Sequence, residues 1–549
     1  MVERDVAVPM RDGVVLRADV YRPEDAAAVP AVVGRTPYDK SLALTPPSIV
    51  DSERAVAEGF ALVCQDVRGQ HGSEGEFEPF KTEGRDGYDT VEWVAAQPWC
   101  SGAVGMAGRS YTAATQWLAA AEQPPHLRAI CPVVTGSDFY DGWVYQGGAF
   151  QLGFNLFWVH LMTSPKGRPS LDEQFRHLPL GDAPLLDTSG AGRFYREWLA
   201  HPTDDEHWSS LSINRRYEKV EVPALNVGGW YDIFLRGTLE NFIRLREEAG
   251  SEHGRSGTRL LIGPWAHGST YGAYPDHAFD TFDGQGGADL DELAIRFYRA
   301  HLLEGQDRPE AEPPVRIFVM GENRWRDEQG WPLARAREEP WFLRGGGGLA
   351  AEPPGEEAPD EYLYDPRAPA PTVGGPTSLP ASFMRTNSGP VDQRKVEDRE
   401  DVLVYTSEPL ERELEVTGPL TVSLHAATSA PDTDFVAKLC DVAPDGFSRI
   451  VAEGVLRARF RDGFDRPRPV EPGTVENYRI DLVATSNVFQ PGHRLRVDVT
   501  SSSFPRFDRN PNTGNELGVD GPDDLRPARQ TVFHDAGRAS HVLLPVVPR

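Results

Sequence analysis

The amino-acid sequence predicts an α/β fold with an insertion, followed by a C-terminal β-sandwich. Three observations lead to this fold class. Strand and helix patterns alternate over the first 135 residues and again after residue 222, the stretch between them lacks buried strand runs, and the end of the chain reads as strands alone. We therefore predict one α/β domain from residues 1–134 and 223–334, an insertion at 135–222 and a β-sandwich at 335–549.

The first part of the α/β domain is predicted from short apolar runs. Val14–Tyr21 alternates apolar and polar side chains, which is typical of a half-buried strand, and Pro30–Gly34 is an apolar run typical of a buried one. The elements predicted after these are a helix at Ser52–Glu58, a strand at Phe60–Gln65, a helix at Asp86–Gln97, a strand at Val104–Ala107 and a helix at Ala114–Glu122. Such alternation favours parallel strands in one sheet.

The insertion is rich in Trp, Phe, His and Pro and contains short helical patterns such as Arg193–Ala200. The α/β pattern then resumes with a strand at Pro223–Val227, a helix at Leu239–Glu247 and a strand at Arg259–Ile262. Because both flanks carry the same pattern, the middle stretch is expected to be inserted into one domain.

The C-terminal region begins with a passage rich in Gly, Pro and Glu. Gly345–Gly348 follows no predicted strand and opens no helix, so this passage, up to Pro380, is expected to be an irregular linker. Beyond it, strands are predicted at Val402–Thr406, Leu420–His425, Phe435–Val442, Tyr478–Leu482, Leu495–Val499 and His541–Val547. Their spacing fits a β-sandwich.

Composition argues against several partners. The 83 acidic and 56 basic residues give a net charge of −27, which repels polyphosphates and anionic lipid, so we expect neither a nucleic-acid nor a membrane partner. No apolar run approaches the ~20 residues of a membrane span, and Met1–Asp5 shows no secretory signal. The four cysteines lie far apart without CxxC spacing, so we expect them to be reduced thiols. A cytoplasmic protein is the expectation.

The strongest chemical signal is a strand that runs through Gly108-Arg109-Ser110 directly into a helix. A serine on such a strained turn exposes its hydroxyl beside a helix N-terminus, where backbone N–H groups favour a developing oxyanion. Thr112 stands at the last position of the usual Gly-x-Ser-x-Gly pattern. The alternative is that Ser110 is a helix N-cap. Ser256 lies in a similar Gly-x-Ser-Gly sequence, which we expect to be a loop because no strand precedes it.

A base and a carboxylate follow Ser110 in the order known for hydrolases of this topology. Asp232 lies just beyond the strand predicted at Pro223–Val227, and His267 lies just beyond the next strand. A serine hydroxyl becomes nucleophilic when an imidazole takes its proton, and a carboxylate orients the imidazole. We therefore predict Ser110, His267 and Asp232 as a catalytic triad.

The residues around this triad resemble the motifs of the cocaine-esterase family, which is related to X-Pro dipeptidyl peptidases and α-amino-acid ester hydrolases. The triad motifs are Gly108-Arg109-Ser110-Tyr111, Gly229-Trp230-Tyr231-Asp232 and Gly263-Pro264-Trp265-Ala266-His267. Further matches are Pro9–Gly13, Arg35–Lys40, Gln65–Gly69, Ser73–Gly75, Arg316–Gly321, Thr485–Asn487 and Phe504–Asn510. Ala113 departs from the family, where glycine is more frequent, and is expected to alter helix packing only.

The resemblance implies an α/β-hydrolase domain, an inserted helical cap and a C-terminal jelly roll. It also implies an oxyanion hole formed by the Tyr38 hydroxyl and the Tyr111 backbone N–H, since a phenol is a good neutral donor. The alternative for Tyr38 is a turn residue with its ring packed after Pro37. A homodimer is what relatives suggest.

The resemblance further implies an aromatic acyl pocket. By position, its residues are Trp143, Trp158, Phe234 and Phe383. Aromatic walls suit an apolar or aromatic acyl group and exclude water from the acyl-enzyme. For each of these residues, ordinary core packing is the alternative.

No cofactor and no metal are expected. Asp508–Asn512 resembles a calcium loop, but Gly514 falls one place late and no glutamate closes the loop. Zinc-type spacing and a Gly-rich phosphate loop are both lacking.

These residues predict a serine hydrolase of acyl esters that works through an acyl-enzyme intermediate. One alternative is an amidase or peptidase of the same superfamily, which would need carboxylates to bind a free amine; Asp138 and Asp141 are the candidates, with hydrogen bonding inside the cap as their other role. A second alternative is a carbohydrate- or partner-binding protein on a degenerate scaffold.

Overall fold

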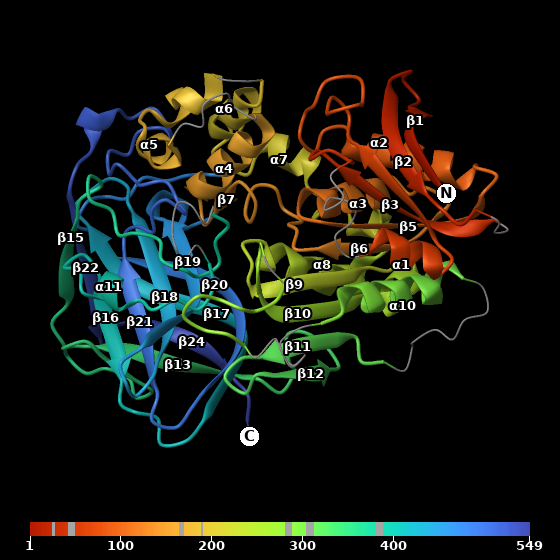
Figure 1. The fold of residues 1–549 in the computed structure, drawn as a ribbon. Helices are drawn as coiled ribbons and strands as arrows, with labels where there is room; N and C mark the ends of the chain where they lie inside the picture. Colours follow the sequence, from red (N-terminus) through yellow and green to blue (C-terminus); the bar gives the residue numbers. More distant parts are fainter. Residues whose placement is uncertain are drawn as a thin grey trace.

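The computed structural model describes residues 1–24, 28–41, 50–163, 170–187, 190–268, 270–279, 288–303, 312–379 and 388–548. Figure 1 shows an α/β region on the right, a β-rich region on the left and a group of helices at the top, above the β-rich region and beside the α/β region. No helix in these described ranges combines the length and the apolar character needed to cross a bilayer.

A ten-stranded sheet forms the centre of the α/β region, in the order β1-β2-β4-β3-β5-β6-β9-β10-β11-β12. The pairs from β4 to β11 along this order are parallel, and antiparallel pairs stand at both edges. The strands are β1 (Val2–Pro9), β2 (Val15–Tyr21), β3 (Val29–Thr36), β4 (Ala61–Asp66), β5 (Cys100–Arg109), β6 (Leu127–Val133), β9 (Leu225–Tyr231), β10 (Arg259–Ala266), β11 (Val315–Val319) and β12 (Arg324–Glu328). Parallel pairing brings the carboxyl ends of β5, β9 and β10 to the same edge.

Helices cover both faces of this sheet because successive strand residues point to opposite sides. Val33 and Met106 face a core shared with α2 and α3, whereas Val32 and Ala107 face a core shared with α1 and α10. The helices of this region are α1 (Ser52–Ala57), α2 (Glu83–Ala95), α3 (Tyr111–Ala121), α8 (Leu235–Glu248), α9 (Glu252–Gly257) and α10 (Leu290–Leu302).

The chain between β6 and β9 forms a helical cap. Its elements are β7 (Tyr145–Gln146), β8 (Ala149–Phe150), α4 (Leu152–Thr163), α5 (Leu171–Arg176), η1 (Leu180–Asp182), η2 (Pro184–Asp187), α6 (Gly192–Ala200), α7 (Glu206–Leu211) and η3 (Tyr217–Lys219). Buried side chains of α4 and α6 belong to the same core as α2 and α3, so the cap and the α/β region are packed as one body.

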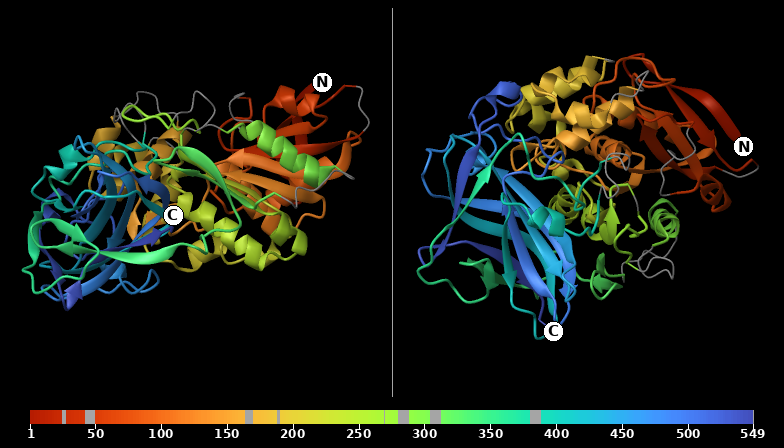
Figure 2. Two further views of the ribbon diagram at one scale, coloured as in Figure 1. Left: turned by 90° about the horizontal axis from the view of Figure 1, so that it is seen from below. Right: turned by 60° about the vertical axis from the view of Figure 1, so that its left-hand side comes forward.

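The β-rich region is a twelve-stranded sheet folded into a sandwich, seen from two further sides in Figure 2. Its strands are β13 (Arg337–Arg344), β14 (Gly348–Ala350), β15 (Asp360–Tyr364), β16 (Leu403–Ser407), β17 (Leu414–Thr428), β18 (Asp434–Val442), β19 (Ser448–Arg457), β20 (Glu476–Phe489), β21 (Arg494–Thr500), β22 (Ala528–Asp535), β23 (Arg538–Ala539) and β24 (His541–Val546). Leu424 and Ile480 from one layer share a core with Leu439 and Val497 from the other. Short helices α11 (Arg394–Glu397), η4 (Ala458–Phe460) and η5 (Pro522–Asp524) lie in its connections.

This architecture confirms the predicted fold class, but two local expectations were wrong. The glycine run does not form a linker: Gly346 and Gly347, both with positive φ, make the turn of a hairpin between β13 and β14. The strand before it was missed because Arg337–Arg344 is charged and half-exposed, without the apolar alternation that marks a strand. Ser256 lies in helix α9 and not in a loop.

Candidate active site

The backbone at Ser110 has the geometry of a nucleophile turn. Ser110 lies between β5 and α3 with φ 57° and ψ −124°, a conformation that non-glycine residues rarely adopt and that marks functional sites. Gly108 precedes it with φ +151°, and a Cβ there would come within 2.6 Å of the Thr112 Cβ. The Ser110 hydroxyl makes no capping hydrogen bond to the helix, so the N-cap alternative does not describe it.

The structure brings Ser110, His267 and Asp232 together from three strand ends. His267 Nε2 lies 3.0 Å from Ser110 Oγ, and His267 Nδ1 lies 2.9 Å from Asp232 Oδ2. Asp232 is only 2% exposed, and its other oxygen accepts the backbone N–H of Phe234 at 2.6 Å. A buried carboxylate that binds one imidazole nitrogen while the other nitrogen faces a hydroxyl can orient a general base.

Arg109 interacts with both His267 and Asp232, a role that the sequence did not predict. Its Nη2 donates to the backbone carbonyl of His267 at 2.8 Å, and its guanidinium interacts electrostatically with Asp232. Burial lowers the pKa of Arg109. This hydrogen bond holds the backbone at His267, which lies just beyond the last β10 residue that pairs with β9. No periodic pattern could have revealed it, because Arg109 stands out only by its place before the serine.

The two tyrosines predicted for an oxyanion hole lie beside Ser110 in different ways. The Tyr38 hydroxyl accepts a hydrogen bond from Trp158 Nε1 at 2.8 Å and also interacts with the Ser110 hydroxyl. Burial raises the pKa of Tyr38 to about 12, so the phenol is a neutral donor at neutral pH. The Tyr111 phenol instead binds Glu83 at 2.9 Å in the core. Tyr111 is the first residue of α3, where a backbone N–H lacks an acceptor within the helix.

Aromatic side chains surround His267. The Phe234 ring lies 5.0 Å from the imidazole and stacks on Trp143 at 4.2 Å between centroids. Phe154 of α4, which the sequence analysis did not single out, lies 6.2 Å from the imidazole. Trp143 and Phe234 are thus packed against each other beside the imidazole, whereas Trp158 packs on Tyr111 and donates to Tyr38. Phe383 lies outside the described residues.

The carboxylates considered for amine binding are occupied within the protein. Asp138 accepts hydrogen bonds from the backbone N–H groups of Tyr140 and Asp141 and from Asn214 at 3.0 Å. Burial raises the pKa of Asp138 to about 7. Asp141 accepts the backbone N–H of Gly147 at 2.9 Å and lies 3.7 Å from the Arg236 guanidinium.

Comparisons with known proteins cover the whole chain. The family model described as X-Pro dipeptidyl-peptidase (S15 family) matches residues 12–269, and the model for the X-Pro dipeptidyl-peptidase C-terminal non-catalytic domain matches residues 308–543. The chain is 37% identical to cocaine esterase of Rhodococcus sp. (strain MB1 Bresler), over 100% of this chain and 99% of that protein.

Two solved structures have the same fold over the full chain. One is an aminopeptidase from a marine sediment Thaumarchaeota archaeon, with TM-score 0.88, 27% identity and coverage of 100% of this chain and 96% of that one. The other is an α-amino acid ester hydrolase, with TM-score 0.87, 27% identity and the same coverage. Both support the fold class predicted from the sequence.

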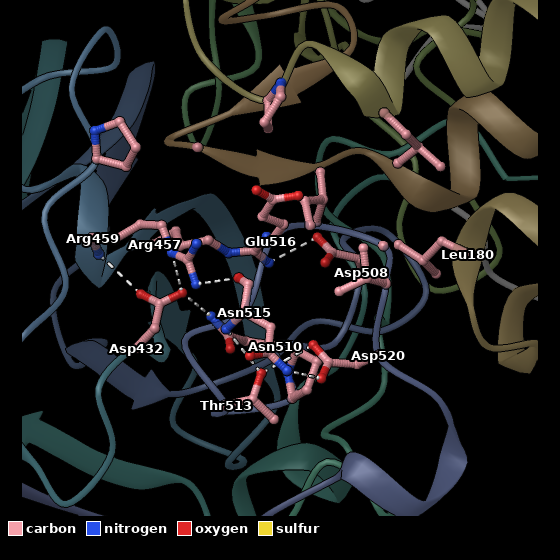
Figure 3. A pocket seen from close by; sticks show the side chains of 18 of the residues that line it. Leu180, Asp432, Arg457, Arg459, Asp508, Asn510, Thr513, Asn515, Glu516 and Asp520 are labelled. Atoms are coloured by element: carbon pink, nitrogen blue, oxygen red, sulfur yellow. Dashed lines mark hydrogen bonds and ion pairs between the residues drawn. The ribbon is translucent and has the colours of Figure 1, made fainter.

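A cavity of about 530 Å³ lies between the cap and the sandwich (Figure 3). The Asp508–Asn512 stretch that resembles a calcium loop forms part of its wall. Arg457 binds Asp508 at 2.9 Å and Asp434 at 2.8 Å, and Arg459 binds Asp432 at 2.7 Å. Guanidinium groups therefore take the place that a cation would occupy among these carboxylates.

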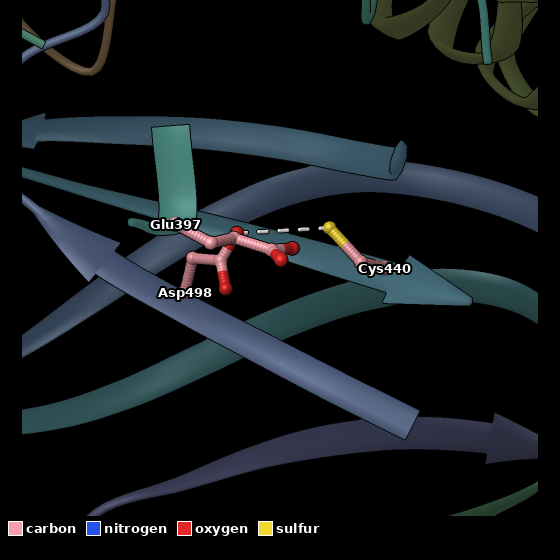
Figure 4. A group of neighbouring side chains, drawn as sticks. All are labelled: Glu397, Cys440 and Asp498. Carbon is pink, nitrogen blue, oxygen red and sulfur yellow. Dashed lines mark hydrogen bonds between the residues drawn. The ribbon is translucent and has the colours of Figure 1, made fainter. Parts of the chain in front are cut away.

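Glu397, Cys440 and Asp498 form a cluster in the sandwich, with ligand atoms within 4.8 Å of one another (Figure 4). The Cys440 thiol donates to Asp498 at 3.7 Å, and Arg496 pairs with Glu397. Burial raises the pKa of the Cys440 thiol well above its usual range, so the thiolate that a metal needs is disfavoured. Burial likewise raises the pKa of Asp498 to about 7.

Asp498→Asn should change how stability depends on pH. Because the folded protein binds the Asp498 proton more tightly than the unfolded chain, this stabilisation is complete at low pH and is lost as pH rises toward 7. The Asn side chain does not titrate, so the variant does not lose this stabilisation as pH rises. Its free energy of unfolding, relative to that of the wild type, should therefore increase by on the order of 1 kcal/mol per pH unit between pH 5 and 7. Urea unfolding at several pH values measures this, with the exposed Asp445→Asn as the control. Parallel pH curves for Asp498→Asn and the wild type would show that Asp498 does not titrate in this range.

Proposed function

We propose that this chain, which belongs to the cocaine esterase-like serine hydrolases related to the X-Pro dipeptidyl peptidases, cleaves acyl esters through an acyl-enzyme intermediate. Family membership makes it a serine hydrolase that acts on ester or amide bonds. The proposal of an acyl-enzyme mechanism rests on one observation, the line of contacts from Ser110 through His267 to Asp232.

In the proposed first step, His267 Nε2 takes the proton of Ser110 as Oγ attacks the ester carbonyl carbon. Asp232 keeps the Nδ1 proton in place and stabilises the imidazolium that forms. The imidazolium then gives its proton to the leaving alcohol, and the acyl group remains on Ser110. Water, activated by the same imidazole, releases the acid and restores the serine.

The proposed oxyanion hole combines two donors. The Tyr38 hydroxyl and the backbone N–H of Tyr111 both stand next to Ser110, at the N-terminal end of α3. A fixed neutral donor and a helix N-terminus stabilise negative charge on the carbonyl oxygen without charge on the enzyme. With a pKa of about 12, the Tyr38 phenol keeps its hydrogen at neutral pH, as a neutral donor must.

An apolar or aromatic acyl group fits the surroundings of His267. Phe154, Phe234 and Trp143 supply aromatic surface there, and the identity with a cocaine esterase points the same way. The likeness to an aminopeptidase structure favours amide substrates with a free amine as the second candidate. Against it, Asp138 and Asp141 are already bound by backbone donors and Arg236.

We assign the α/β-hydrolase domain to residues 1–134 and 223–334, the cap to 135–222 and the jelly roll to 335–549. A cytoplasmic location and a homodimer complete the proposal, the first from the absence of cysteine pairing and the second from the family resemblance.

Ser110→Ala should lower turnover of a p-nitrophenyl acyl ester by on the order of 10⁴-fold or more, because it removes the hydroxyl that faces His267 Nε2. The circular dichroism spectrum should be unchanged. A fluorophosphonate should label the wild type and not the variant. Ser256→Ala, in the second Gly-x-Ser sequence, is the matched control and should keep full activity. Retained turnover in Ser110→Ala would reject the nucleophile assignment.

Tyr38→Phe should lower kcat by about 10²- to 10³-fold with a much smaller change in KM, because the lost donor acts on charge that develops in the transition state. Steady-state kinetics on the same ester measures the split. Tyr88→Phe, far from the site beneath Arg11, serves as the control. A rise in KM alone would instead assign Tyr38 to substrate binding.

A substrate panel separates the two candidate functions. Neutral acyl esters should give higher kcat/KM than amino-acid and X-Pro anilides, because Asp138 and Asp141, the candidate amine-binding carboxylates, already have partners within the protein. Each anilide is compared with its N-acetylated form, which removes the amine charge. Faster cleavage of anilides that depends on the free amine would favour a peptidase.

A further inference from the structure

The hydrogen bond between Trp158 and Tyr38 fixes which way the phenol points. An indole N–H only donates, so at 2.8 Å it must occupy a lone pair of the Tyr38 oxygen. The phenol has a single hydrogen, which is then free to point at its other neighbour, the Ser110 hydroxyl. Trp158 therefore prevents the phenol from turning its hydrogen toward the cap.

We propose that Trp158 is a positioning residue of the reaction, which acts through Tyr38 by holding the phenol hydrogen toward the oxyanion. This inference rests on the proposed function and goes beyond the role of Trp158 as a pocket wall. A wall residue affects which acyl groups bind, whereas a donor to Tyr38 affects the charge that develops on the carbonyl oxygen.

The proposed mechanism needs one direction of hydrogen bonding along the whole site. The indole N–H of Trp158 donates to Tyr38, and the Tyr38 hydroxyl lies beside the Ser110 hydroxyl, whose Oγ is 3.0 Å from His267 Nε2. In that mechanism Nε2 accepts the serine proton and Nδ1, 2.9 Å from Asp232, donates to the carboxylate. In a chain whose bonds all run one way, each donor polarises the next. The indole N–H sets the direction at the start, because it alone cannot accept.

The indole is held firmly enough to do this. Trp158 is 3% exposed and lies on α4 of the cap, stacked between Tyr111 at 5.8 Å and Trp198 at 5.8 Å. Tyr111 opens helix α3, so the ring that orients one proposed oxyanion donor is packed on the residue that supplies the other. The bond from Trp158 also lowers the pKa of Tyr38 against the opposite effect of burial, which makes the phenol a better donor.

A double-mutant cycle tests the proposal. Trp158→Phe in the wild type should lower kcat on the order of tenfold, the size expected for one neutral hydrogen bond, with KM changed less than about threefold. In the Tyr38→Phe background the same substitution should lower kcat by less than about twofold, because the group it acts through is gone. Trp198→Phe removes an indole from the same aromatic stack without touching Tyr38 and should leave kcat within about twofold.

An isosteric replacement of Trp158 separates the effect of losing the hydrogen bond from the effect of losing packing. Replacing Trp158 with 3-benzothienyl-alanine keeps the ring system and exchanges the N–H for sulfur, so it should reproduce the fall in kcat. Equal losses in both Tyr38 backgrounds, or a change in KM alone, would overturn the positioning role and leave Trp158 as a wall. These outcomes are distinct from failure of the proposed function, which Ser110→Ala reports independently.

Discussion

The contact between Ser110 and His267 depends on three strands ending at one edge of a parallel sheet. β5, β9 and β10 deliver the serine, the carboxylate and the imidazole, and parallel pairing makes their carboxyl ends coincide. At that edge Ser110 adopts a left-handed backbone conformation, which lifts its hydroxyl out of the helix it precedes. The strain is tolerated because buried strands on both sides fix the turn.

Each residue of the proposed active site is then supported from a different part of the chain. Arg109 holds the carbonyl of His267, α4 of the cap holds Tyr38 through Trp158, and Tyr231 at the end of β9 donates its hydroxyl to Ile450 of the sandwich at 3.1 Å. The sandwich thus supports the strand end that carries the carboxylate. Positioning of this kind accounts for a site assembled from three regions of one chain, since small displacements would separate the reacting atoms.

The order of apolar runs along the sequence predicted the fold class. It also predicted that the reactive residues follow the ends of strands. It did not predict side-chain roles that depend on contact. Arg109 carries no pattern, and Phe154 lies on α4, a helix apolar on nearly every side, so periodicity could not say which residue faces His267. The β13–β14 hairpin was missed for the opposite reason, because its strand is charged and half-exposed. Contacts between residues that are far apart in the sequence can be read only from the structure.

Charge alone would suggest that this protein prefers cationic substrates, since its net charge is −27. Binding of a protonated amine by a carboxylate, however, requires a carboxylate in the site that nothing else neutralises. Asp138 and Asp141, the candidate carboxylates of the cap, are bound by backbone N–H groups, and the raised pKa of Asp138 weakens its charge further. Aromatic rings face His267 instead. The long-range field can draw a cation toward the protein, whereas the aromatic surroundings of His267 agree with the neutral acyl group that we propose as substrate.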